Sequence, residues 1–146
     1  MKKLNFLCNC ALVGAFLAGA GCKSSSAIPS TPSGLPEVNL RAKTIDEVKV
    51  VAEKFFISRG YVEKRSDHLY EMVYDKPNKI SQSGRALRVR LRLHKETGEH
   101  WRLIGTPMGV DGWHTNLETE TVLQEGAIQI QGFLVEIKNQ IESTGK

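Results

Sequence analysis

Hydrophobic and polar residues alternate most regularly in residues 85–94, which read Arg-Ala-Leu-Arg-Val-Arg-Leu-Arg-Leu-His. A period of two is typical of a β-strand, here with one apolar face and one face that carries arginine. Residues 95–98 have the composition of a turn, so residues 99–108 are expected to return as a second strand. If the loop places Leu93 near Trp101, the apolar side chains of both strands share one face.

A second hairpin is predicted just upstream. Residues 61–65 and 68–74 also alternate with a period of two, and they are separated by turn-forming residues at Ser66 and Asp67. Residues 77–84 are polar, which favours an exposed loop before the next strand. The two hairpins together predict a sheet of about four strands.

Amphipathic helices are predicted before and after these strands. Thr44–Glu47 has the capping-box pattern, in which a threonine oxygen accepts a hydrogen bond from the backbone amide three residues later. Hydrophobic residues then recur at helical spacing as far as Gly60, which can end the helix. Thr115–Glu118 repeats the capping-box pattern and is expected to open the last helix. The apolar stripe of that helix, at steps of four and three, is Leu123, Ala127, Ile130, Leu134, Ile137 and Ile141.

These elements predict an α+β fold in one domain over residues 41–146. Each amphipathic element must bury its apolar side against another layer. The simplest arrangement is therefore an antiparallel sheet of about four strands, with the N-terminal helix and the long C-terminal helix packed on one face. The arginines of residues 85–94 would then face solvent. A domain of this size is large enough to bury a core.

The first 21 residues have the layout of a secretory signal peptide. Two lysines follow the initiating methionine, and residues 4–21 are uncharged, first apolar and then small. Residues 17–22 read Leu-Ala-Gly-Ala-Gly-Cys and resemble the lipobox of bacterial lipoproteins, with Gly19 where that motif usually has leucine. The resemblance implies that the thiol of Cys22 is lipidated and that the peptide bond before it is cut. An ordinary cleaved signal and a helix retained in the membrane are the alternatives.

Residues 22–40 comprise Cys22 and a stretch rich in serine and proline, without helical or strand periodicity. This composition predicts a tether that spans roughly 20 to 25 Å. Cys8 and Cys10 would leave with the signal peptide, so residues 41–146 would contain no thiol. A disulfide framework, a thiol nucleophile and a cysteine-bound zinc ion are then excluded from the mature domain.

The lipid on Cys22 would hold the protein at the cell envelope. In lipoproteins sorted as in enteric bacteria, Lys23 after the cysteine is compatible with delivery to the periplasmic side of the outer membrane. In a species with a single membrane, the protein would lie on the outer face of that membrane. Cleavage removes two of the 20 basic residues and none of the 16 acidic ones, so net charge gives little reason to expect nucleic acid as a partner.

The arginine row is the candidate binding surface. Arg88, Arg90 and Arg92 follow one another at every second position, and Arg102 is expected on the neighbouring strand. Planar guanidinium groups bind carboxylates and phosphates with two hydrogen bonds each. The row therefore suggests an acidic envelope protein or another polyanion as partner, unless these arginines only keep an open sheet face soluble. Nucleic acid is not expected, because the strand lacks the aromatic residues of a single-strand platform.

No pattern for a catalytic residue, a metal site or a cofactor is found. The chain has no Gly-x-Ser-x-Gly elbow, no His-Glu-x-x-His helix and no phosphate loop. His94 and His100 could approach each other across the hairpin, but a zinc site needs further ligands. Two functions stay open: a non-enzymatic binding or assembly module, and a small-ligand carrier or hydrolase with a pocket near Trp101 and Trp113.

Overall fold

The computed structural model describes residues 30–78 and 84–144. The predicted signal peptide, Cys22 and most of the predicted tether lie outside the described residues. No helix in the described ranges is long and apolar enough to cross a membrane.

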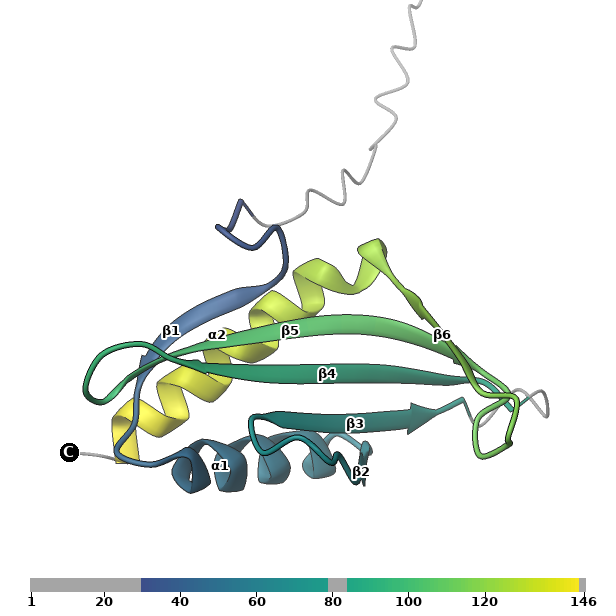
Figure 1. The fold of residues 1–146 in the computed structure, drawn as a ribbon, viewed down its shortest axis with the longest axis horizontal. Helices are drawn as coiled ribbons and strands as arrows, with labels where there is room; N and C mark the ends of the chain where they lie inside the picture. The colour runs from purple at the N-terminus through teal and green to yellow at the C-terminus, as the bar shows by residue number, and fades with distance from the viewer. Residues whose placement is uncertain (1–29, 79–83, 145–146) are drawn as a thin grey trace, which may run out of the picture.

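The described chain has an α+β fold with one antiparallel sheet and two helices, of which the C-terminal one is long (Figure 1). The sheet runs in the order β1-β5-β4-β3-β2, and β6 pairs with the far end of β5. The elements are β1 (Glu37–Arg41), α1 (Ile45–Ser58), β2 (Val62–Lys64), β3 (Glu71–Pro77), β4 (Ala86–Lys95), β5 (His100–Asp111), β6 (Thr119–Val122), the short 3-10 helix η1 (Gln124–Gly126) and α2 (Ala127–Thr144).

The prediction of about four strands is wrong by two, and the first extra strand, β1, lies at the end of the predicted tether. Val38 and Leu40 alternate with polar residues and pair with Leu103 and Trp101 of β5. This alternation covers only a few residues and follows a stretch rich in serine and proline, so the sequence pattern does not indicate a strand here. The folded domain therefore begins near Glu37 rather than at residue 41.

The second extra strand, β6, replaces the predicted start of the last helix. The Thr115 hydroxyl donates to the backbone oxygen of Gly112 and accepts from the amide of Leu117. It therefore holds a local turn in place of a helix cap, since threonine serves both purposes. Helix α2 begins only at Ala127, after β6 and η1.

The predicted β4–β5 hairpin is present, but its register differs by two residues. Leu93 pairs with Leu103 rather than with Trp101, because the chain turns tightly around Gly98, whose φ is +60°. The amides of Glu96 and His100 close this loop by donating to the backbone. A shift of two residues leaves every side chain on its predicted face.

The main core lies on one side of this sheet. Phe56 of α1 stacks on Tyr74 of β3, with ring centroids 4.6 Å apart. Both helices contribute to this core, α1 with Val48, Ala52, Phe55 and Phe56, and α2 with Ile130, Leu134, Ile137 and Ile141. Strand β1 adds Val38 and Leu40. The apolar face of the β4–β5 hairpin adds Val89, Leu91, Leu93, Trp101 and Leu103.

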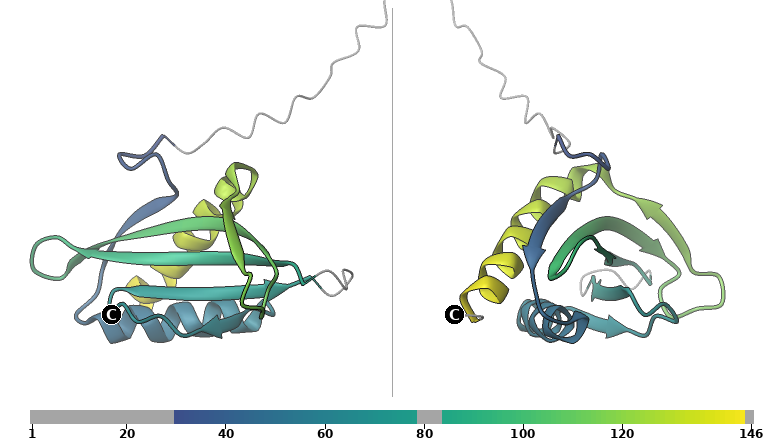
Figure 2. Two further views of the ribbon diagram at one scale, coloured as in Figure 1. Left: turned by 45° about the vertical axis from the view of Figure 1, so that its right-hand side comes forward. Right: turned by 60° about the vertical axis from the view of Figure 1, so that its left-hand side comes forward.

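Figure 2 shows that the sheet is curved, and its other face also buries side chains. Val73, Met108 and Val110 are buried there, apart from the main core, together with Asp75 and Arg88. The segment that joins β5 to β6 reaches across this face to β3 and β2, as the contacts described below show. The sheet therefore has two buried sides, which differ in polarity.

Two glycines should respond oppositely to alanine. At Gly105, under α2, an added Cβ would lie 2.5 Å from Cγ2 of Ile130, whereas at Gly132 nothing lies within 4 Å. Gly105→Ala should lower the free energy of unfolding by about 1 to 3 kcal/mol, because α2 must move. Gly132→Ala should raise it by up to about 1 kcal/mol through helix propensity. Urea unfolding measures both, and a neutral Gly105→Ala would contradict the close approach.

Candidate functional site

A buried arginine occupies the centre of the curved face. Arg88 of β4 pairs in register with Asp75 of β3, and its side chain is only 1% exposed. Its Nε and Nη2 donate to the two carboxylate oxygens of Asp75 at 2.6 and 2.7 Å. This two-point geometry is the strongest that an arginine forms with a carboxylate.

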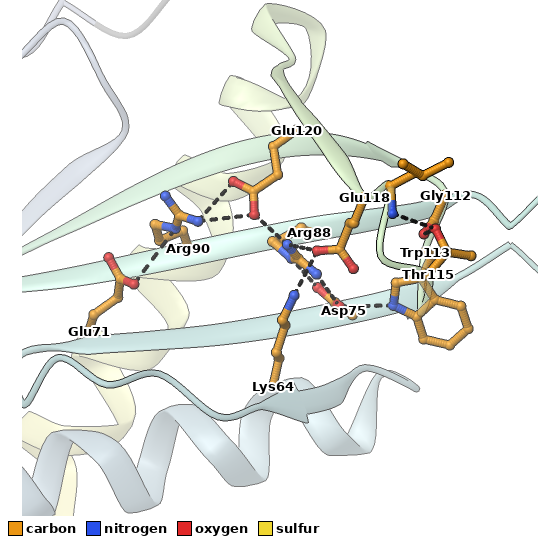
Figure 3. A network of polar contacts seen from close by, with 11 residues as sticks. Lys64, Glu71, Asp75, Arg88, Arg90, Gly112, Trp113, Thr115, Glu118 and Glu120 are labelled. Atoms are coloured by element: carbon orange, nitrogen blue, oxygen red, sulfur yellow. Dashed lines mark hydrogen bonds and ion pairs between the residues drawn. The ribbon is translucent and has the colours of Figure 1, made fainter.

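Two further carboxylates reach Arg88 from the last part of the sheet (Figure 3). Nη1 of Arg88 donates to Glu118 at 2.6 Å and also to Glu120 of β6. Glu118 in turn binds Nζ of Lys64 on β2 at 2.6 Å. Arg88 thus connects β4 to β3 and β6, and Glu118 extends the connection to β2.

Trp113 completes this contact from the β5–β6 connection. Its Nε1 donates to Oδ2 of Asp75 at 2.9 Å, and its backbone amide donates to the Gly84 oxygen at 2.6 Å. The next residue, His114, has a φ of +63°, a conformation that is uncommon outside glycine. Trp113 therefore attaches the β5–β6 connection to the rest of the domain through both its side chain and its backbone.

The network continues along the arginine row. Nη2 of Arg90 donates to Glu120 at 2.8 Å, and its Nε lies 3.8 Å from Glu71. Arg92 donates to Glu71 at 3.0 Å, and the hydroxyl of Ser66 donates to the same carboxylate at 3.1 Å. Each arginine of the row has at least one acidic partner within the chain.

Charge in this network is balanced among the described residues. The cations are Lys64, Arg88, Arg90 and Arg92, and the anions are Glu71, Asp75, Glu118 and Glu120. The expectation that the arginines face solvent is wrong for Arg88, and it is only partly correct for Arg90, whose side chain is 26% exposed. The side chain of Arg92 is 57% exposed. The row therefore carries much less free positive charge than its sequence implies.

Arg102 lies on the same face but outside this network. It pairs with His94 across β4 and β5, and its Nε is 3.5 Å from Glu96. Its side chain is 33% exposed. The four arginines predicted as one binding set are therefore divided: Arg88, Arg90 and Arg92 belong to the network and Arg102 does not. Arg92 and Arg102 have the most exposed side chains of the four.

The network shifts the pKa of two of its carboxyl groups. Burial opposes the charged form of Glu118, but hydrogen bonds and charges from Arg88 and Lys64 outweigh it and lower the pKa to about 2. Burial likewise opposes ionisation of Glu71, yet hydrogen bonds from Arg92 and Ser66 and the nearby charges lower its pKa. Both carboxylates are charged at neutral pH.

Sequence reasoning missed the acidic half of the network. The period of two over residues 68–74 puts Glu71 and Val73 on one strand face, and its extension to Asp75 puts a carboxylate on the same face, in register with Arg88. The capping-box pattern at Thr115–Glu118 instead predicts that Glu118 opens a helix, which gives no reason to expect it beside Arg88. Nothing local in the sequence places β6 beside β5.

The two tryptophans do not share a pocket. Trp101 is buried in the main core, where its Nε1 donates to the Ala42 oxygen at 3.0 Å. Trp113 follows the opposite end of β5, roughly 30 Å away along an extended strand. It lines a pocket of about 250 Å³ with His114, Lys64 and Glu118. The predicted pocket near both tryptophans is therefore wrong.

A larger cleft opens on the helix side of the sheet, away from the β4–β5 turn. Lys76, Leu87, Gly109 and Thr121 are cross-strand neighbours and form one row across β3, β4, β5 and β6. Directly opposite residues of antiparallel strands share a face. Leu87 is 50% exposed, whereas Val89, two residues further along β4, is 2% exposed. The helices therefore cover the sheet at Val89 but do not extend over this row.

The uncovered row forms the floor of a cleft of about 980 Å³. Pro77 and Leu123 add apolar lining, and Arg59 and Arg85 contribute charged side chains. Ligand pockets commonly measure about 300 to 1,000 Å³ and combine an apolar lining with a few polar groups. By size and lining, this cleft is a candidate ligand site.

No protein-family model matches the sequence, and no curated protein matches it. Function is therefore inferred from the residues described above and from the N-terminal sequence.

Replacement of the central arginine should destabilise the fold strongly. Arg88→Met should lower the free energy of unfolding by about 3 to 5 kcal/mol, because it leaves buried carboxylates without their cation. Arg92→Gln is the matched control on the same strand face, and its exposed pair should contribute less than about 1 kcal/mol. Urea unfolding of both variants measures the difference. Equal effects would contradict a structural role for the buried pair.

Acid should weaken the fold partly through Glu118. Its folded-state pKa of about 2 lies below the ordinary value of 4.5, so its stabilising contribution is complete above about pH 5 and is lost as pH falls toward 2. This contribution reaches about 3 kcal/mol at most. Glu118→Gln should therefore flatten the fall of unfolding free energy between pH 5 and pH 2. Urea unfolding at each pH measures this free energy. If it fell as steeply with pH in Glu118→Gln as in the wild type, the lowered pKa of Glu118 would be contradicted.

Proposed function

We propose that this protein is a lipid-anchored protein of the bacterial cell envelope whose folded domain is a non-enzymatic binding module. The anchor rests on the lipobox-like residues 17–22, which place Cys22 directly after two small residues. Strand β1 begins at Glu37, so fourteen residues, 23–36, separate the anchor from the fold. A flexible chain of that length would span about 20 Å, and the hydrogen-bonded turn at residues 31–35 shortens this reach. The domain would therefore lie close to the membrane surface.

The observation that carries the binding role is the uncovered row of the sheet. Leu87 is half exposed on the floor of the cleft of about 980 Å³, although it lies on the apolar face of β4. Exposed apolar surface in a concave site favours ligand binding over a purely structural role. We therefore place the binding site at this cleft, in preference to the arginine row.

If the partner is an acidic envelope protein or another polyanion, we propose that it contacts two of the four arginines, Arg92 and Arg102. Arg88 and Arg90 are engaged by Asp75 and Glu120, whereas Arg92 and Arg102 keep exposed side-chain surface. Exposed charges of this kind favour encounter with a partner more than they add affinity. We keep this surface as a secondary contact.

Substitution of the lipobox cysteine tests the anchor. Cys22→Ser should move the protein from the detergent phase to the aqueous phase in a cloud-point separation, because it removes the thiol that would carry lipid. Cys10→Ser is the matched control, since that cysteine would leave with the signal peptide. Mass spectrometry of the wild-type N-terminal peptide should show acylated Cys22. An unmodified N-terminus at another residue, or an uncleaved chain, would overturn the anchor.

A further inference from the structure

We propose that the cleft binds a single-chain amphiphile with an anionic head group, such as a fatty acid carboxylate. This inference rests on the proposed function, because it assigns a ligand class to the same cleft. It follows from the order of the floor residues, the charge at the rim and the shape of the open end.

The floor presents an apolar stretch beside one cation. Lys76 on β3 lies directly opposite Leu87 on β4, and Leu87 lies opposite Gly109 on β5. Gly109 has no side chain, and a Cβ placed there would come within 3.4 Å of the Leu123 side chain. Leu123 therefore packs against the sheet at Gly109, and the exposed apolar part of the floor is Leu87. A hydrocarbon chain can lie on Leu87, flanked by Pro77 and Leu123, with its head group beside Lys76.

The charge at the rim favours a negative head group. Arg59 is paired with Glu136 at 2.6 Å and Arg85 with Asp111 at 2.7 Å. Lys76 forms no ion pair within the described part of the chain, and its Nζ lies 5.2 Å from the ring centroid of Tyr61. Its charge is therefore available to a ligand. Positive charges outnumber negative ones among the lining residues, in which Asp111 is the only acid within the described ranges.

The rows on the covered side close the inner end of the cleft. Tyr74 stacks on Phe56 of α1, and an added Cβ at Gly126, just before α2, would lie 2.9 Å from Cβ of Pro107. The apolar face of the sheet is therefore filled up to the row of Tyr74 and Pro107 and open at the next row. A ligand enters from the open end and meets the packed core at the other.

Three probes with the same chain and different head groups test this proposal. Isothermal titration calorimetry would use dodecanoate, dodecyltrimethylammonium and dodecyl maltoside, each below its micelle concentration. The protein would be residues 22–146 with Cys22→Ser, which keeps every described residue and needs no detergent. Dodecanoate should bind with one-to-one stoichiometry and at least about tenfold more tightly than the cationic probe, as expected for one charge-assisted contact.

Two variants connect the binding to the cleft. Lys76→Gln should weaken dodecanoate binding about tenfold and leave dodecyl maltoside unchanged. Lys95→Gln is the matched control, because Lys95 is also exposed and its Nζ also lies near an aromatic ring, 5.5 Å from Trp101. Gly109→Val should weaken binding of all three probes, because its side chain would push Leu123 away from the sheet and into the cleft, and thermal unfolding would verify that this variant folds.

The outcomes separate this inference from the proposed function. Equal binding of the anionic and cationic probes, or an unchanged affinity in Lys76→Gln, would overturn the anionic head group while leaving the cleft as a binding site. Absence of binding by any dodecyl probe would overturn both the amphiphile and the cleft. Neither result would affect the lipid anchor on Cys22, which is measured independently.

Discussion

The buried guanidinium of Arg88 is the interaction on which the curved side of the sheet depends. Removing an arginine from water is costly, and the cost is offset only when its hydrogen bonds are satisfied. Asp75, Glu118 and Glu120 satisfy them from three different parts of the chain. The same contacts hold β6 and the β5–β6 connection against β3 and β4. The position of β6 then determines where η1 and α2 begin.

This constraint explains why the arginine-rich strand carries little free positive charge. Arginines arranged at every second residue are suited to a polyanion only when their charge is free. In this protein the acidic partners belong to the same chain, and the network has no net charge. The arginine row therefore stabilises the fold first, and only Arg92 and Arg102 keep surface for an external partner.

The helix side of the sheet has the opposite character. Its apolar row extends beyond the helices, so that Leu87 remains half exposed beside Lys76. Among the described residues, one end of the sheet thus combines an apolar floor with a cation that has no ion-pair partner, while the network on the other face is internally neutral. The proposed tether would keep the domain within about 20 Å of a membrane, which contains amphiphilic molecules. The proposed anchor and the proposed ligand are therefore physically compatible, although each has its own test.

The sequence by itself determined the features that depend on neighbouring residues. The alternation of residues 85–94, the capping box at Thr44 and the helical stripe through Ile137 and Ile141 each gave a correct element, because backbone geometry repeats over a few residues. Only the tertiary structure decided which arginines are buried and which remain exposed. The carboxylates that bury Arg88 lie 13, 30 and 32 residues away in the chain. The tertiary structure also decided where β6 pairs and where the cleft opens. Pairing between distant segments, and how far a helix covers a sheet, leave no pattern among neighbouring residues.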